Sequence, residues 1–347
     1  GIDVFVFDPT AQWTGMLQKC TEHEMLRHYD KFGMKERDAA GFPGYIKRIK
    51  DPTEYLNLGK LLKRPKKEGE MGRIWVFLID QLDSRDLDVF IANTINDIFK
   101  SNPEESQKLR ALIIFDEVHR LLPRFGGKGL GITMLERAVR EFRKWGIGLV
   151  LASQVIADFE KEIRANIRTQ IQLWTRDEEE LERIKEKFGL GYMQSVAKAA
   201  VGTGMVFNSD YNKGRPYFIH FRPILHRLTR LEEDVIIKWD KYTRRLEELQ
   251  EKLDKLREAG ADIFDLEIEL GLARKKLEEG AFDVVDLYLE SVEPRIDKEC
   301  KARKIEIKKV RVTEEELKKA EMEAKKERVK AEKAEDEKES RKPEKKT

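Results

Sequence analysis

Short, continuous apolar runs recur along the first part of the chain, and each predicts a buried strand. They span residues 2–7, 73–80, 111–117, 147–154 and 169–174. Between them, residues 87–101 and 135–145 place apolar side chains along one helical stripe. Apolar strands separated by helices are typical of a parallel sheet that is covered on both faces. The pattern therefore predicts an α/β fold with a mostly parallel sheet.

The ends of this predicted core need separate interpretation. Residues 202–210 and 216–223 are expected to form a hairpin that closes the sheet. Residues 38–70 are rich in Gly and Pro and are expected to form an inserted, partly helical excursion. Residues 2–7 read as an interior parallel strand, which needs neighbours on both sides. We therefore expect a core over residues 1–226 that is incomplete at its N-terminus.

The composition changes after residue 226. Leu246, Leu249, Leu253 and Leu256 alternate spacings of three and four, and Gly260 then breaks the helix. Residues 227–312 are expected to form a helical hairpin or bundle with coiled-coil character, which suits partner binding or self-association better than catalysis. Residues 313–347 are charged with almost no apolar face, and are predicted to be a solvated helix or disordered.

Composition excludes few functions. Lys and Arg total 68 and Asp and Glu total 66, so the net charge of +2 gives no overall argument for nucleic-acid binding. The 39% of charged residues, with Lys and Glu dominant, resembles the composition of thermophile proteins. Cys20 and Cys300 match no disulfide or zinc spacing, which fits a cytoplasmic protein. No apolar run approaches the roughly 20 residues of a membrane span, and there is no signal-peptide pattern.

Candidate chemistry lies at the ends of the predicted strands. Asp8, Asp80, Asp116 and Gln154 all end apolar runs, and ligands of α/β sheets bind beyond the carboxyl ends of the strands. In nucleoside triphosphatases the first acid after such a strand holds Mg²⁺ through water, and the second polarises the attacking water. Asp116 and Glu117 have this arrangement, with Gln154 placed to sense a γ-phosphate. The alternative is that both acids cap the following helix. Isolated histidines, His119 among them, show no ligand spacing.

The order of several motifs is more specific than any one of them. VFVFDP and ALIIFDEVHRLLP are followed by REFRKWGIGLVLASQ and by RANIRTQIQLW, and GTGMVFNSD and PYFIHFRP close the series. In the third motif Arg140, Arg143, Lys144, Trp145 and Gly146 precede a strand that ends in Ser-Gln. Over residues 1–226 the chain resembles the HerA and FtsK superfamily of ring-forming ATPases, which includes the ATPases of conjugation and type IV secretion.

The resemblance implies a RecA-like P-loop core in a hexameric ring that hydrolyses ATP with Mg²⁺ and moves DNA. It implies that Asp116 positions the metal through water, that Glu117 activates water, and that Asp8, Asp116 and Gln154 contact the nucleotide. A homo-oligomer and DNA are the implied partners, with a nuclease or a membrane secretion complex as a further partner of the helical extension.

The chain departs from the family pattern at two points. It has no G-x-x-x-x-G-K-[ST] loop, and since the family places that loop before VFVFDP, we expect it upstream of these residues. As given, the chain is expected not to bind ATP productively. Trp174 stands where relatives often carry Arg, and Arg168 or Arg176 is the expected substitute.

Basic residues supply further candidates. Arg140, Arg143, Arg164 and Arg168 could complete a neighbouring subunit's site, with Arg143 and Arg168 favoured by motif position; the alternative is that they are surface residues paired with nearby acids. Arg124 and Lys128, in a glycine-rich loop, could reach DNA in the ring pore, or the loop could be an ordinary surface loop. A secretion or pilus-assembly ATPase and a non-hydrolysing ring scaffold are the alternative functions.

Overall fold

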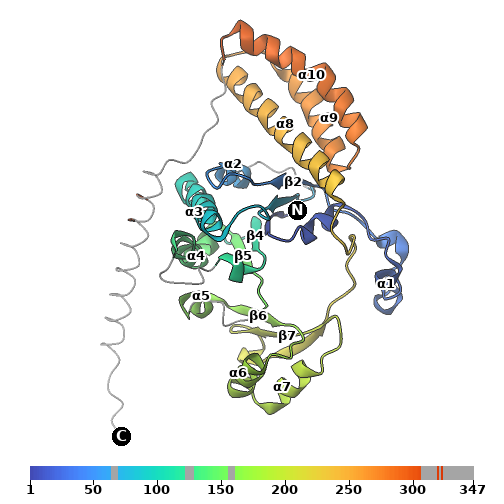
Figure 1. Cartoon of the computed structure of the whole chain (residues 1–347), viewed down its shortest axis with the longest axis vertical. Helices are drawn as coiled ribbons and strands as arrows, with labels where there is room; N and C mark the ends of the chain where they lie inside the picture. Colours follow the sequence, from blue (N-terminus) through green and yellow to red (C-terminus); the bar gives the residue numbers. More distant parts are fainter. Residues whose placement is uncertain (64–68, 122–128, 155–160, 306–318, 320–321, 323–347) are drawn as a thin grey trace.

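The chain forms two sheets and a bundle of long helices (Figure 1). The computed structural model describes residues 1–63, 69–121, 129–154, 161–305, 319 and 322. The predicted charged tail, 313–347, thus lies outside the described residues apart from two positions. None of the helices within these ranges combines the length and the apolar character that a bilayer span needs.

A parallel sheet of five strands forms the core. In pairing order, the strands are β2 (Gly44–Arg48), β3 (Ile74–Leu78), β1 (Asp3–Asp8), β4 (Ala111–Phe115) and β5 (Ile147–Leu151). Every residue of β2 and β3 is buried. Phe7 of β1 stacks between Phe77 and Phe115, with ring centroids 5.3 and 4.7 Å away. The predicted parallel α/β core is confirmed.

Helices follow the strands as expected for a parallel sheet. Those of the parallel-sheet unit are α2 (Leu58–Leu62), α3 (Ser84–Ser101), α4 (Leu130–Glu141) and α5 (Lys161–Asn166), whereas α1 (His23–Leu26) has no buried residue and lies apart from the sheet (Figure 1). Short 3-10 segments lie at Gln12–Leu17, Tyr29–Phe32, Glu36–Asp38, Val118–Leu121, Phe142–Trp145 and Asn212–Gly214. Asp88 of α3 accepts hydrogen bonds from the N–H groups of Leu130 and Gly131, at 2.9 and 2.8 Å. This bond set fixes the start of α4 against α3.

The predicted closing hairpin exists but joins a different sheet. β7 (Thr203–Asn208) pairs antiparallel with both β8 (Tyr217–His220) and β6 (Thr169–Gln172). With α6 (Glu178–Phe188) and α7 (Leu190–Ala197), these strands form a separate unit below the parallel sheet in Figure 1. The expectation that the hairpin closes the parallel sheet was wrong, because β6 takes its partner from β7 and leaves β5 at the sheet edge.

Residues 38–70 do not form the expected excursion. They contain β2, an edge strand of the parallel sheet, and α2. The strand was missed because its sequence, GYIKR, carries Lys47 and Arg48, which are only 7% exposed each. Buried cations of this kind are rare unless acids pair with them, and here the acids come from distant parts of the chain.

The predicted helical extension is confirmed as the bundle of α8 (Glu233–Glu258), α9 (Phe264–Glu278) and α10 (Phe282–Ala302). α8 packs directly on β2 (Figure 1). Lys47 Nζ lies 2.7 Å from a carboxylate oxygen of Glu247, and Asp240 accepts a hydrogen bond of 2.9 Å from the N–H of Arg48. Trp239 is buried and donates to the carbonyl of Gly44 at 3.3 Å. The bundle and the sheet therefore share one hydrophobic core.

Candidate functional site

The two adjacent acids lie where β4 leaves the sheet. Asp116 still donates its N–H to the carbonyl of Phe7 on β1, at 3.1 Å, and Val118 donates to Ala152 beyond β5, at 2.9 Å. Glu117, between them, has a φ of +48°, in the left-handed region that side chains other than glycine disfavour. The two acids thus follow one strand end through a left-handed turn and have different hydrogen-bond partners. Strain of this kind persists only where the surroundings hold it, and it clusters at functional sites.

Glu117 is held by two side chains from different segments. Gln154 Nε2, just beyond β5, donates to both carboxylate oxygens of Glu117, at 3.2 and 3.4 Å. His119 Nδ1 lies 3.1 Å from Glu117 Oε2, an ion-pair distance without the alignment of a hydrogen bond. The structure thus brings together Glu117 and Gln154, as the order of parallel strands predicts.

Asp116 has its own set of donors. Trp13 Nε1 donates to Asp116 Oδ2 at 2.9 Å, and the N–H of Glu117 donates to Oδ1 at 3.0 Å. Within the described residues, neither acid accepts from a backbone N–H of the 3-10 helix Val118–Leu121. The hydrogen bonds therefore do not support the capping alternative. Each carboxylate oxygen of Asp116 retains a lone pair for a water molecule.

Asp8 is fully buried beside Asp116 and organises the loop that follows β1. Its carboxylate accepts hydrogen bonds from Thr10 N–H at 2.8 Å, Thr10 Oγ1 at 3.0 Å and Trp13 N–H at 2.8 Å. Burial raises the pKa of Asp8, the bonds from Thr10 and Trp13 oppose the increase, and the negative charge of Asp116 adds to it. In the structure Asp8 positions Trp13 on Asp116, and its direct contact with a nucleotide stays a prediction.

The other predicted residues lie apart from this cluster. Asp80, beyond the end of β3, pairs at 3.3 Å with Arg48, the last residue of the edge strand β2. Arg140 and Arg143 precede β5, at the opposite end of the sheet from Glu117, because all five strands run parallel. Arg168 pairs with Asp210 at 2.8 Å beside the small sheet.

The remaining candidates have different surroundings. Arg164, in α5, lines a pocket with residues of α6 and the small sheet. Trp174 donates its Nε1–H to the carbonyl of Ala197 at 3.2 Å, beside α7. Arg124 and Lys128 lie outside the described residues. The roles proposed for the arginines and for the loop therefore stay predictions.

The side chains offer a divalent metal only a partial shell. Within the described ranges, no group of three or more His, Cys, Asp or Glu side chains could hold a metal ion. Mg²⁺ bound to a nucleotide usually takes one or two carboxylates, several waters and the phosphates. Asp116, with a partly exposed carboxylate and free acceptor capacity, fits that sparse arrangement.

Trp13 and His119 are the residues that sequence reasoning missed. Their signals are short local patterns: Asp8 stands two residues before Thr10, as in an Asx turn, and His119 stands two residues after Glu117. Neither pattern shows by itself which carboxylate the ring would meet.

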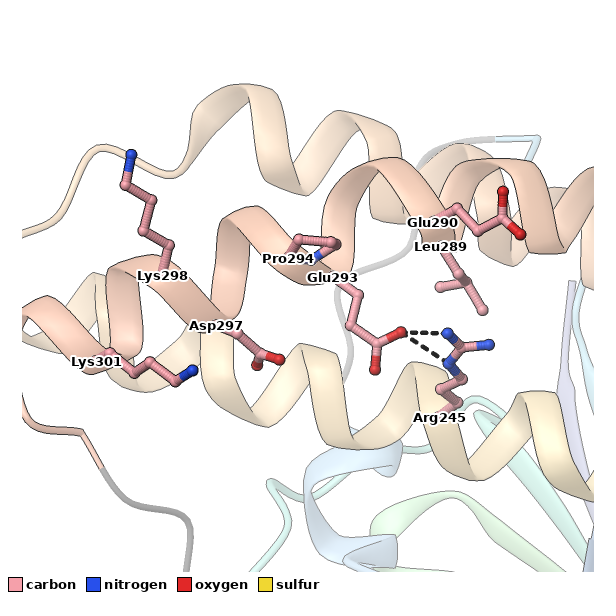
Figure 2. A pocket seen from close by; sticks show the side chains of 8 residues that line it. All are labelled: Arg245, Leu289, Glu290, Glu293, Pro294, Asp297, Lys298 and Lys301. Atoms are coloured by element: carbon pink, nitrogen blue, oxygen red, sulfur yellow. Dashed lines mark hydrogen bonds and ion pairs between the residues drawn. The ribbon is translucent and has the colours of Figure 1, made fainter.

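A hollow on the bundle, between α8 and α10, lies far from these carboxylates (Figure 2). An ion pair between Arg245 and Glu293 crosses it, and Lys298 and Lys301 line its rim. Arg245 also lies 3.7 Å from Asp286, so its charge is satisfied within the bundle. This hollow shows no convergence of unpaired groups on one ligand.

Comparisons with known proteins give a limited result. No protein-family model matches the chain, and no curated protein sequence does. Among solved structures, it is similar to the genome packaging NTPase B204 from Sulfolobus turreted icosahedral virus 2 in complex with ATP-gammaS, at 13% identity over 64% of this chain and 98% of that chain, with a TM-score of 0.34. It is also similar to the bacterial conjugative coupling protein TrwBdeltaN70, at 16% identity over 50% of this chain and 45% of that chain, with a TM-score of 0.38.

Proposed function

We propose that this chain is part of a DNA-translocating ring ATPase that hydrolyses ATP with Mg²⁺. The observation that carries the proposal is the contact between Glu117 and Gln154 beside Asp116, at the carboxyl ends of adjacent parallel strands. That place is where α/β sheets bind their ligands. Two adjacent carboxylates after β4 and an amide after β5 supply groups that phosphoryl transfer to water uses.

Each residue has a distinct task in this proposal. Glu117 orients the attacking water and accepts its proton, and Gln154 reports the position of the γ-phosphate through its amide. Asp116 would hold Mg²⁺ through water, and the ion, when bound, neutralises charge on the phosphates. Trp13 and Asp8 fix the Asp116 carboxylate in place. His119 limits the rotation of Glu117.

A phosphate-binding loop is a further element that the reaction requires, and we propose that the segment carrying it pairs with the edge of β5. The open edge of β5 supports this part of the proposal. Val150 is 41% exposed although it belongs to an apolar strand, and three of the five strand residues are only half-buried. Gln154 stands three residues after the end of that strand, so a segment paired with β5 would lie near the cluster.

The ring, its six subunits and its DNA substrate rest on the family resemblance alone. In such a ring Arg143 or Arg168 would reach the site of a neighbouring subunit. Both lie away from Glu117 of their own subunit, as a residue that acts on a neighbour would. A secretion ATPase would share the chemistry, and turnover stimulated by DNA would separate the two functions.

Glu117→Gln tests the proposed hydrolysis in a form of the protein that carries a phosphate-binding loop. We expect nucleotide binding to stay within about threefold and turnover to fall by roughly a hundredfold or more, because the amide cannot accept the proton of water. Asp80→Asn is the matched control, since Asp80 also ends a parallel strand but pairs with Arg48. Turnover of Glu117→Gln at the wild-type rate would contradict the assignment.

A further inference from the structure

The helix α9 is apolar on two opposite sides. Its inner side packs in the bundle through residues that are at most 6% exposed, namely Leu266, Leu270, Ala273 and Leu277. Its outer side carries Phe264, Ile268 and Leu272, which are 67%, 48% and 42% exposed. These three stand at intervals of four, so they form one stripe along the helix. A surface helix normally has a single apolar stripe, and the second stripe of α9 is unusual.

The charges of the outer side are segregated along the helix. Asp265, near the N-terminus of α9, is exposed, and Lys275, near its C-terminus, is exposed and lies seven residues from Ile268 on the same side. The remaining acids of the first half serve the bundle, since Glu267 pairs with Arg257 and Glu269 with Arg295. The outer side therefore presents an apolar middle with an acid at one end and a base at the other.

We propose that the outer side of α9 binds the same side of α9 in a second copy of this chain, with the two helices antiparallel. If Ile268 lies opposite the partner's Leu272, the same two-fold register places Asp265 opposite the partner's Lys275. A parallel arrangement would instead bring like charges together. The antiparallel register thus satisfies the apolar stripe and the charges at once.

Gly271 lies near the centre of this register and favours close approach. It is exposed, and a Cβ built on it would meet no atom within 4 Å, so its backbone faces open space. A glycine at a helix crossing lets two backbones approach more closely than larger residues do. Glycine weakens a helix by about 1 kcal/mol relative to alanine, and a contact at this position offsets that cost.

The proposed contact is isologous, since the same surface is used on both copies. Neighbours in a closed ring of several subunits meet through two different surfaces. The α9 contact would therefore join two subunits that are not ring neighbours, and it exists whether or not the chain forms a ring. It does not depend on the proposed ATPase activity.

Sedimentation of the purified chain over a range of concentrations tests the proposal. We expect reversible self-association that Ile268→Lys weakens by at least about tenfold, because it places two cations at the centre of the contact. Leu287→Lys is the matched control, since Leu287 is 67% exposed on α10 and lies outside the stripe, and we expect it to leave self-association unchanged. A wild-type chain that stays monomeric, or an Ile268→Lys variant that associates as the wild type does, overturns the proposal.

Two further variants test the register. Asp265→Lys should weaken association and the double variant Asp265→Lys with Lys275→Asp should restore it, whereas an equally weak double variant would overturn the antiparallel pairing. Gly271→Cys should give a disulfide-linked dimer under mild oxidation, and Leu287→Cys should not. The native Cys20 and Cys300 are buried and leave this readout clear. Absence of the Gly271→Cys dimer would overturn the contact even if the chain associates through other surfaces.

Discussion

The two edges of the parallel sheet differ sharply. At the β2 edge every strand residue is buried, and α8 closes the edge with Trp239 and with ion pairs to Lys47 and Arg48. At the β5 edge most strand residues are half-buried or exposed, and no described strand pairs with the outer side. The candidate site lies beside the open edge. The comparison separates a structural edge from one that remains available to another segment.

The closed edge is held by charges as well as by apolar contacts. Burial alone would lower the pKa of Lys47, but Glu247 and Glu54, 2.7 and 3.1 Å away, raise it. The carboxylate of Asp240 accepts a hydrogen bond from the N–H of Arg48, which would otherwise be an unpaired donor of the edge strand. α8 thus occupies the place beside β2 that a further strand would otherwise take.

The largest effect is expected at Trp239, which lies between the bundle and β2. Trp239→Ala should lower the free energy of unfolding by about 4 kcal/mol, because a fully buried indole is lost from the shared core. Urea unfolding measures this change. Ile237→Ala, two residues away and 55% exposed, should change the free energy by less than about 0.5 kcal/mol. Equal effects would show that the bundle does not close the sheet.

A direct comparison of the two edges gives the next largest effect. Ile46→Ala on β2 should cost about 3 kcal/mol, since Ile46 is fully buried. Val150→Ala on β5 should cost less than about 1 kcal/mol in this chain, because that side chain is 41% exposed. Both values come from urea titrations of the two variants. A cost at Val150 as large as that at Ile46 would contradict the open edge.

The smallest effect is expected where the small sheet leads back to the bundle. Glu22 accepts from the N–H of Leu228 at 2.9 Å. Burial alone would raise the pKa of Glu22, but hydrogen bonds from Thr21, Cys20 and Leu228, together with its own N–H, lower it to about 2. Its contribution to stability is therefore present above its unfolded pKa of 4.5 and is lost as the pH falls toward 2.

Glu22→Gln tests this pH dependence. Because Glu22 is only partly buried and solvent screens its charge, the loss of stability at pH 7 should be below about 1 kcal/mol. Urea titrations between pH 7 and pH 3 should show the variant approaching the wild type as the pH falls. A difference that stays constant with pH would mean that the carboxylate charge plays no part.

The sequence predicted what depends on strand periodicity and strand order. Asp116, Glu117 and Gln154 were expected together because parallel strands end at one edge of the sheet, and the structure places them in contact. β2 escaped prediction because its buried Lys47 is neutralised by Glu247, 200 residues later. Trp13 and His119 escaped because a loop and a left-handed turn at Glu117 place them. Periodicity carries no signal for contacts of that kind.

The most direct test of the proposed site is a double-mutant cycle on Glu117 and Gln154. Phosphate release after mixing with ATP and Mg²⁺ would be followed for Glu117→Gln, Gln154→Ala and the double variant, each with a phosphate-binding loop present. If the two side chains act as one unit, the double variant should be no slower than Glu117→Gln alone. Independent losses that multiply in the double variant, or release at the wild-type rate in either single variant, would contradict the account.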